Sequence, residues 1–420
     1  MANPAVLAVN GGTPIRTEGY PGVGNAAGRT IGKEELANVT QVLESGMLNR
    51  GGGTFVPRIE KKFAEHLGVK YCTASTSGTS AIHVAVGAIN PSPGDEIITG
   101  PITDMGTVIP ILAQNAIPVF ADLRRDNIGL DAADVERRIT ERTVAIIPVH
   151  LCGNATDMDP LMKLAEKYNL KVIEDCSQAY GTLYKGKHVG TIGHMGTFSL
   201  QQSKHITTGD GGLTVTNDDE LGDRAALFAN KGWPNYGASA RNYIAFGMNY
   251  RMTELQAAVL DAQLDKVDWV TGRRNEIGER ICQAVKNFEG VEIPGVSEGG
   301  RHTYWFLPLL IDQKKLGITT DKLAQALNAE GAPAGAHYIG RPIFMYDLLR
   351  QKKIYGDSSF PFSLQPEGQE VRYEEGETPG TEQILSDMLQ ITVNEKMTDQ
   401  DVTDIIACLE KVWANLDELR

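Results

Sequence analysis

Three short segments carry the residues best suited to chemistry, and each stands at the carboxyl end of an expected strand. The first, Thr76 to Ser80, follows the strand-like run YCTAS and opens a helical pattern. Backbone N–H groups at a helix N-terminus, beside small hydroxyl side chains and a glycine, can bind a phosphate. Ser and Thr are also ordinary helix caps. This segment alone therefore predicts either a cap or a phosphate site.

The second segment ends with Asp175, the last residue of LKVIED. We expect this strand to be buried on both faces, where an unpaired carboxylate costs several kcal/mol. Asp175 is therefore either a strand-end cap or a counter-charge that holds a heterocyclic nitrogen in its protonated form.

The third segment places Lys204 between the strand-like runs GTFSL and GLTVT, with glycines at 209, 211 and 212. A lone loop lysine is usually solvated. Near cationic or apolar neighbours, however, the pKa of a lysine falls, and the free amine can attack an aldehyde to form a Schiff base.

Open α/β sheets bind ligands at the carboxyl ends of their strands, so the three segments are expected to meet. A phosphate site, a carboxylate and a lysine are together what pyridoxal phosphate needs. The lysine binds the aldehyde, and the aspartate keeps the pyridine nitrogen protonated, so that the ring can withdraw electrons. The combination predicts a pyridoxal-phosphate enzyme.

The elements that must position these residues alternate β-branched runs with helix-period segments from about Lys70 onward. This pattern predicts an α/β fold with a mostly parallel, seven-stranded sheet between helices. Residues 1–32 are expected to form an extended N-terminal arm of a kind that often lies on a partner subunit. Residues 33–288 are expected to form the large cofactor-binding domain, and residues 289–420 a smaller C-terminal α+β domain.

Two helices are predicted in more detail. The pattern KEELANVTQVLESG places Leu36, Val39, Val42 and Leu43 on one face of a helix. A second helical pattern, from Thr253 to about Phe288, predicts one long helix.

Composition excludes several classes of protein. The net charge is −13, and no basic patch stands out, which argues against a nucleic-acid partner. The longest charge-free apolar run, 105–121, is too short and too interrupted by prolines to span a membrane. The N-terminus lacks the features of a secretory signal, and the five cysteines contain no C-x-x-C pair, so we expect a cytoplasmic protein with reduced thiols. His150 and Cys152 fit a polar strand end better than a zinc site.

Four motifs together resemble the DegT/DnrJ/EryC1/StrS family of sugar aminotransferases over essentially the whole chain. They are T-S-G-T-S, E-D-C-S-Q-A-Y-G, F-S-L-Q-Q-S-K-H-I-T-T-G-D-G-G and G-M-N-Y-R-M-T-E-L-Q-A-A-V. The resemblance implies a fold-type-I, pyridoxal-phosphate-dependent aminotransferase that works as a homodimer, with active sites at the subunit interface.

The resemblance also implies roles for individual residues. Lys204 matches the Schiff-base lysine, which is also the general acid and base, and Asp175 matches the partner of the pyridine nitrogen. The remaining matches are Gln178 near the ring hydroxyl, Gly78, Thr79 and Ser199 at the phosphate, and Asn249 as a phosphate contact from the neighbouring subunit.

Within the family, S-x-Q-Q-S-K is more similar to glutamine-dependent scyllo-inosose aminotransferases and aminohydroxybenzoate synthases than to nucleotide-sugar enzymes. We therefore expect a keto-cyclitol or keto-sugar acceptor and L-glutamine or L-glutamate as the donor, in a ping-pong reaction. A nucleotide-sugar aminotransferase, a pyridoxal-dependent sugar dehydratase and a non-catalytic regulatory protein on the same fold remain alternatives. The dehydratase branch has histidine in place of the lysine, so Lys204 favours amino transfer.

Two residues depart from the family pattern: Asp104, and Asp210, which stands where Glu is commoner. Where an aromatic side chain commonly stacks on the pyridine ring, Thr103 is followed by Asp104. An acid at this place would instead read a hydroxyl or an amine of the substrate. For His337 and Tyr338, in AHYIGRPIF, substrate contact and simple packing are equally open.

Overall fold

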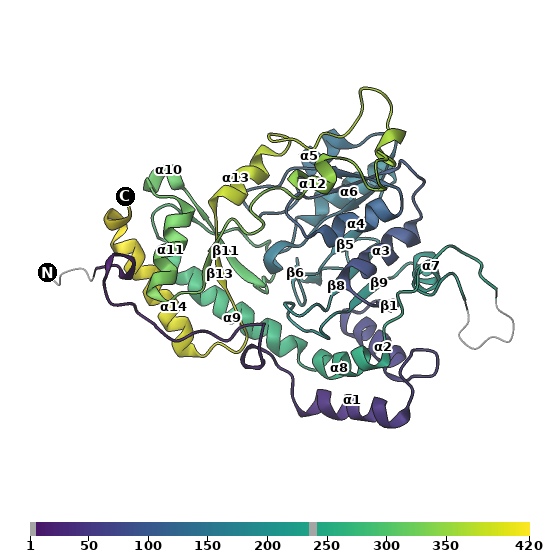
Figure 1. Cartoon of the computed structure of the whole chain (residues 1–420), viewed down its shortest axis with the longest axis horizontal. Helices are drawn as coiled ribbons and strands as arrows, with labels where there is room; N and C mark the ends of the chain where they lie inside the picture. Colours follow the sequence, from purple (N-terminus) through teal and green to yellow (C-terminus); the bar gives the residue numbers. More distant parts are fainter. Residues whose placement is uncertain (1–5, 235–241) are drawn as a thin grey trace.

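The computed structural model describes residues 6–234 and 242–420. Its larger sheet has seven strands in the order β1-β9-β8-β5-β4-β2-β3, and every strand expected from the sequence is present. Strands β1, β5, β8 and β9 of this sheet are labelled in Figure 1. All run in one direction except β9, which is antiparallel to both of its neighbours. The strands are β1 (Tyr71–Ser75), β2 (Glu96–Thr99), β3 (Ile117–Phe120), β4 (Thr143–Ile147), β5 (Lys171–Asp175), β8 (Met195–Ser199) and β9 (Gly212–Thr216). The predicted mostly parallel sheet is confirmed.

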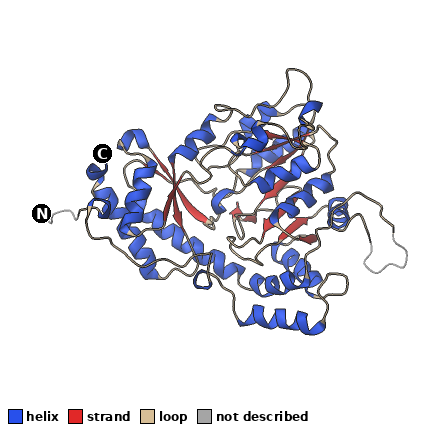
Figure 2. Cartoon of the chain, viewed as in Figure 1, coloured by secondary structure: helices blue, strands red, loops and turns tan. Residues whose placement is uncertain are grey.

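Helices surround this sheet, as Figure 2 shows for the strands drawn in red at the right. Strands β2, β3, β8 and β9 are buried along their whole length, as expected for a sheet covered on both faces. The surrounding helices are α2 (Phe55–Leu67), α3 (Gly78–Ile89), α4 (Met105–Ala113), α5 (Ala132–Arg138), α6 (Met158–Tyr168) and α7 (Asp219–Ala229). Because β1, β5 and β8 run in the same direction, their carboxyl ends meet at one edge of the sheet.

A smaller C-terminal domain lies at the left of Figure 1. Its antiparallel sheet has the order β10-β11-β13-β12, and it has a hydrophobic core of its own. The strands are β10 (Val291–Glu292), β11 (Phe306–Ile311), β12 (Ala334–Ala336) and β13 (Met388–Thr392), and the helices are α10 (Gln313–Leu316), α11 (Thr320–Glu330), α13 (Pro379–Asp387) and α14 (Asp399–Ala414). Helix α12 (Asp347–Arg350) instead packs against the large domain (Figure 1), where Leu349 shares a hydrophobic cluster with residues of α4 and β3. A two-stranded hairpin, β6 (Leu183–Tyr184) and β7 (Lys187–His188), completes the strands.

The single long helix expected after Thr253 is wrong, because the chain forms α8 (Glu254–Leu264) and α9 (Val267–Val285). The side chains of Gln263 and Lys266, at the break, both donate hydrogen bonds to Glu35 at 2.7 Å. No glycine or proline marks the break in the sequence. The break coincides with the contacts of Gln263 and Lys266 with Glu35, which a local sequence pattern does not reveal.

Helix α1 (Lys33–Ser45) packs against α8 and buries only part of its expected apolar face. Val42 is buried, but Leu36 is 70% exposed and Leu43 is 58% exposed. Within one chain, these two leucines have no core to cover them.

The N-terminal arm follows the chain's own C-terminal domain. Leu7 lies in the core of that domain, and its N–H donates to Glu418. Arg16 forms ion pairs with Asp401 and Asp404 at the start of α14. No helix within residues 6–234 and 242–420 is both long and apolar enough to cross a membrane.

Candidate active site

A cavity of about 320 Å³ lies at the carboxyl ends of β1, β5 and β8, where the sequence placed the chemistry. Trp305, just before β11, and Tyr338, which follows β12, also contribute to its lining. Six of the seven predicted site residues line this cavity: Gly78, Thr79, Asp175, Gln178, Ser199 and Lys204. The side chains of positions 175 and 204 therefore belong to one cavity.

The start of α3 and the end of β8 form a concave group that we call the phosphate cradle: Ser77, Gly78, Thr79 and Ser199. Ser77 caps the helix by accepting a hydrogen bond from the Ser80 N–H. Gly78 and Thr79 occupy the first two helical positions, whose N–H groups have no carbonyl partner within a helix. A Cβ on Gly78 would lie 2.6 Å from Ser199 Oγ, so only glycine lets the two elements approach this closely.

Asp175 is buried and held in a fixed orientation. Its Oδ2 accepts a hydrogen bond from Thr107 Oγ1 at 2.7 Å, and its Oδ1 accepts one from the Ser177 N–H at 3.0 Å. Each carboxylate oxygen has two acceptor sites, so Asp175 can still accept from a ring N–H. Gln178 is fixed as well, since its Nε2 donates to Tyr338 Oη at 3.0 Å and its Oε1 accepts from the Cys152 N–H.

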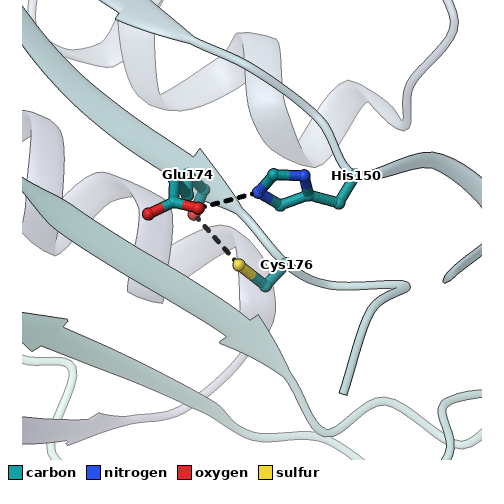
Figure 3. A group of neighbouring side chains, drawn as sticks. All are labelled: His150, Glu174 and Cys176. Atoms are coloured by element: carbon teal, nitrogen blue, oxygen red, sulfur yellow. Dashed lines mark hydrogen bonds and ion pairs between the residues drawn. The ribbon is translucent and has the colours of Figure 1, made fainter. Parts of the chain in front are cut away.

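A buried group beside Asp175, made of His150, Glu174 and Cys176, brings together three possible metal ligands (Figure 3). The Thr156 N–H donates to His150 Nδ1, so His150 Nε2 carries the proton and donates to Glu174 at 2.9 Å. Glu174 also accepts hydrogen bonds from three backbone N–H groups, at residues 190, 192 and 193. The ligand atoms of His150 and Glu174 are thus already engaged, and the group ties the end of β5 to two neighbouring loops.

Lys204 closes a tight turn, residues 201–204, which we call the lysine loop. Its N–H donates to the Gln201 carbonyl at 2.9 Å. Two donors from distant segments bind the loop's backbone: Trp305 Nε1 reaches the Ser203 carbonyl at 2.8 Å, and Arg29 Nη2 reaches the Lys204 carbonyl at 2.9 Å. Both donors lie outside the sheet that carries the loop, so the arm and the C-terminal domain fix the position of Lys204.

The surroundings of Lys204 favour its free amine. Burial lowers the pKa of Lys204, while the negative charges of Asp175 and Asp104 act in the opposite direction and offset burial only in part. The amine nitrogen lies 4.2 Å from the centre of the Trp305 ring. A lysine with a lowered pKa is a better nucleophile near neutral pH than an exposed one.

The remaining predicted residues separate into two groups. Tyr338 lines the cavity, but His337 does not. Burial acts to lower the pKa of His337, but hydrogen bonds to the Asp321 carboxylate and the Leu385 carbonyl outweigh it and raise that pKa. Asn249 is exposed and lies outside the cavity of its own chain, so its predicted contact across subunits stays a prediction.

Sequence reasoning missed Thr107, Trp305 and Arg29. Their contacts with Asp175, Ser203 and Lys204 join residues 68, 102 and 175 positions apart. No spacing rule connects such pairs, and only the folded chain identifies them.

Comparison with known proteins agrees with this geometry. The profile of the DegT/DnrJ/EryC1/StrS aminotransferase family matches residues 29–410. The chain belongs to this family. It is therefore a pyridoxal-phosphate-dependent aminotransferase, and the family acts on sugars or cyclitols.

Relatives from different branches of the family are similarly close. A putative L-glutamine:3-amino-2,3-dideoxy-scyllo-inosose aminotransferase from Micromonospora echinospora is 33% identical, over 99% of this chain and 98% of its own. The GDP-perosamine synthase of Caulobacter vibrioides is 34% identical, over 86% and 90%. Among solved structures, 3-amino-5-hydroxybenzoic acid synthase is 26% identical with a TM-score of 0.80, over 93% and 97%.

The residues present fit pyridoxal phosphate. The phosphate cradle has space that a Cβ on Gly78 would fill, Asp175 retains acceptor capacity, and Lys204 has a lowered pKa. Each feature corresponds to one part of the cofactor: its phosphate, its ring nitrogen and its aldehyde.

Proposed function

We propose that the chain transfers an amino group from L-glutamine or L-glutamate to a keto-cyclitol or keto-sugar in a ping-pong reaction. The observation that carries the proposal is the shared cavity, which places Lys204, Asp175 and the phosphate cradle around one space. An amine, a carboxylate and a set of free N–H groups in one cavity are the minimum that this reaction needs.

The proposed roles follow from the contacts. When bound, pyridoxal phosphate supplies an aldehyde and an electron-withdrawing ring. The Lys204 amine holds the cofactor covalently in the resting protein and moves protons during amino transfer. Asp175 would accept a hydrogen bond from the ring nitrogen, and Gln178 would contact the ring hydroxyl. Gly78, Thr79 and Ser199 would hold the phosphate.

We also propose a cytoplasmic homodimer with shared active sites. Leu36 and Leu43 expose apolar surface on α1, and Asn249 is exposed outside its own cavity. In a dimer, the leucines would be covered, and Asn249 of one subunit would reach the phosphate bound by the other. Sedimentation analysis of the wild type and of Leu36→Glu tests this, because a monomeric wild type would contradict it.

Two acceptor classes are supported by different observations. The Gln201-Gln202 pair before Ser203-Lys204 and the similarity to the Micromonospora relative favour a keto-cyclitol. The similarity to GDP-perosamine synthases favours a nucleotide-linked keto-sugar as the second candidate.

The test supplies L-glutamine labelled at its α-amino nitrogen, together with scyllo-inosose or a nucleotide-linked keto-sugar. Mass spectrometry of the product then reports which ketone receives the label. Label in the cyclitol supports the proposal, label only in the nucleotide sugar supports the second candidate, and label in neither refutes both. L-glutamate with the same label identifies the better donor.

A further inference from the structure

Two buried hydroxyl groups lead to the Asp175 carboxylate. Thr107 Oγ1 donates to Asp175 Oδ2 at 2.7 Å, and Thr103 Oγ1 lies 2.7 Å from Thr107 Oγ1. A hydroxyl has one hydrogen to donate, and Thr107 donates its hydrogen to the carboxylate. Thr103 must therefore be the donor to Thr107. We call this ordered series, from Thr103 through Thr107 to Asp175, the threonine relay.

The threonine relay lies inside the protein, at the wall of the cavity. Thr103 is 2% exposed, Thr107 is 1% exposed and Asp175 is 3% exposed, and all three contribute to the cavity lining. A buried hydroxyl without a hydrogen-bond partner destabilises the fold. Valine has nearly the same shape and would avoid this cost, so packing alone does not account for the two threonines.

Local helix structure does not account for the direction of the Thr107 hydroxyl. Thr107 lies in the first turn of α4, and a helical threonine often bonds to a carbonyl of the preceding turn. Here the hydroxyl instead reaches Asp175, 68 positions away at the end of β5. The backbone of Asp175 is held separately, because its N–H donates to the Pro148 carbonyl and its carbonyl accepts from the His150 N–H. The relay therefore acts on the carboxylate.

The donors around Asp175 favour its charged form. Thr107 donates to Oδ2 and the Ser177 N–H donates to Oδ1, and hydrogen bonds to a carboxylate stabilise its negative charge. Within residues 6–234 and 242–420, Lys204 is the one cation in the cavity lining. A charged carboxylate leaves a shared proton on its partner, whereas a carboxylate that loses a donor draws this proton toward itself.

We propose that Thr107, oriented by Thr103, is a positioning residue that keeps the proton shared with Asp175 on the pyridine nitrogen of the cofactor. The inference rests on the proposed function, in which Asp175 is the partner of this nitrogen. A protonated ring withdraws electrons more strongly than a neutral one. Thr107 thus supports amino transfer through Asp175.

The test uses holoenzyme loaded with pyridoxal phosphate that is isotopically labelled at the ring nitrogen. The NMR resonance of this nitrogen reports its protonation directly, and we expect the position of a protonated pyridine in the wild type. Thr107→Val should move the resonance toward the unprotonated position. Thr103→Val should cause a smaller shift in the same direction, because Thr107 can still donate to Asp175.

A rate measurement accompanies the NMR experiment. The single-turnover reaction with the faster of L-glutamine and L-glutamate should slow by about 10- to 100-fold in Thr107→Val, the range of a hydrogen bond to a charged group. Thr107→Ser keeps a hydroxyl at this position, so it should retain both the wild-type resonance and most of the rate.

Thr214→Val is the matched control, because it removes an equally buried hydroxyl from β9. Thr214 Oγ1 donates to the Ala81 carbonyl at 2.8 Å, and Thr214 lies outside the cavity lining. The resonance should stay in place in this variant. An unchanged resonance in Thr107→Val or in Thr103→Val would overturn the relay, as would an equal shift in Thr214→Val.

Asp175→Asn separates this inference from the proposed function. If Asp175→Asn moves the resonance and Thr107→Val does not, Asp175 keeps its proposed role and the relay alone is wrong. If Asp175→Asn leaves the resonance in place, Asp175 is not the partner of the ring nitrogen, and both the proposed role and the relay are wrong.

Discussion

The phosphate cradle and the lysine loop lie in the same cavity but are built in different ways. The cradle comes from backbone at the ends of two strands, and its close approach depends on a glycine at position 78. The lysine loop is held by donors from the N-terminal arm and from the C-terminal domain. The cradle therefore depends on two strand ends of the large sheet, whereas the position of Lys204 depends also on the N-terminal arm and on Trp305.

Replacing Lys204 by alanine should cause the largest loss of amino-transfer activity among the variants considered. We expect amino transfer to fall by at least about 10³-fold, because both the covalent attachment and the proton transfer are lost. The purified variant should not be yellow from covalently bound cofactor, and borohydride should trap none. Covalent trapping in Lys204→Ala would show that another amine holds the cofactor.

The lowered pKa of Lys204 gives a pH prediction for the apoprotein. At a given pH, a lower pKa leaves more free amine, so covalent capture of added cofactor should reach its plateau below the ordinary lysine pKa of about 10.5. As the pH falls through the lowered pKa, the amine becomes protonated and capture slows. A rate that continues to rise through the ordinary range would contradict this.

Replacing Gly78 by alanine should damage the cradle and spare the lysine loop. The added Cβ meets Ser199, and overpacking of this kind costs about 1–3 kcal/mol, so cofactor affinity should fall about tenfold or more. Equilibrium titration of the apoprotein measures it. Gly272→Ala is the control, because its Cβ meets nothing within 4 Å. Equal affinities in the two variants would exclude the cradle as the phosphate site.

Replacing Arg29 by methionine should damage the lysine loop and spare the cradle. Loss of a hydrogen bond from a charged group costs about 1.5–3 kcal/mol, so kcat should fall about tenfold while cofactor affinity changes less. Arg124→Met, which breaks an exposed ion pair with Asp126, is the control and should be nearly silent. An unchanged kcat in Arg29→Met would show that the contact of Arg29 with the lysine loop does not contribute to catalysis.

The smallest effect is expected for Trp305→Phe, which removes the indole N–H that reaches Ser203. A neutral hydrogen bond contributes about 0.5–1.5 kcal/mol, so kcat should fall only a few-fold. Trp413→Phe removes a similar hydrogen bond, to the Glu289 carbonyl, away from the cavity. If both variants lose the same activity, the effect of Trp305 is one of general stability.

The contrast between the phosphate cradle and the lysine loop also shows which features of the fold and the site could be predicted from the sequence. The seven strands and the meeting of Asp175 and Lys204 in one cavity follow from periodicity and from the rule that strand ends gather ligands. The break between α8 and α9 and the role of Arg29 do not, because each depends on side chains that meet only after folding. For His337 the sequence left substrate contact and packing equally open, and in the structure its Nε2 lies 3.0 Å from Asp321 Oδ2, while the neighbouring Tyr338 lines the cavity.

The hydrogen bond from the Trp305 indole affects when, during synthesis of the chain, Lys204 becomes able to bind the cofactor aldehyde. Translation proceeds from the N-terminus, so a ribosome completes the segment 76–80 and the loop at 201–204 well before residue 305 emerges. Until then, one of the loop's two distant supports does not exist. A truncated product that ends before Trp305 would thus present an amine on a loosely held turn, and aldehyde capture by such fragments should be poor.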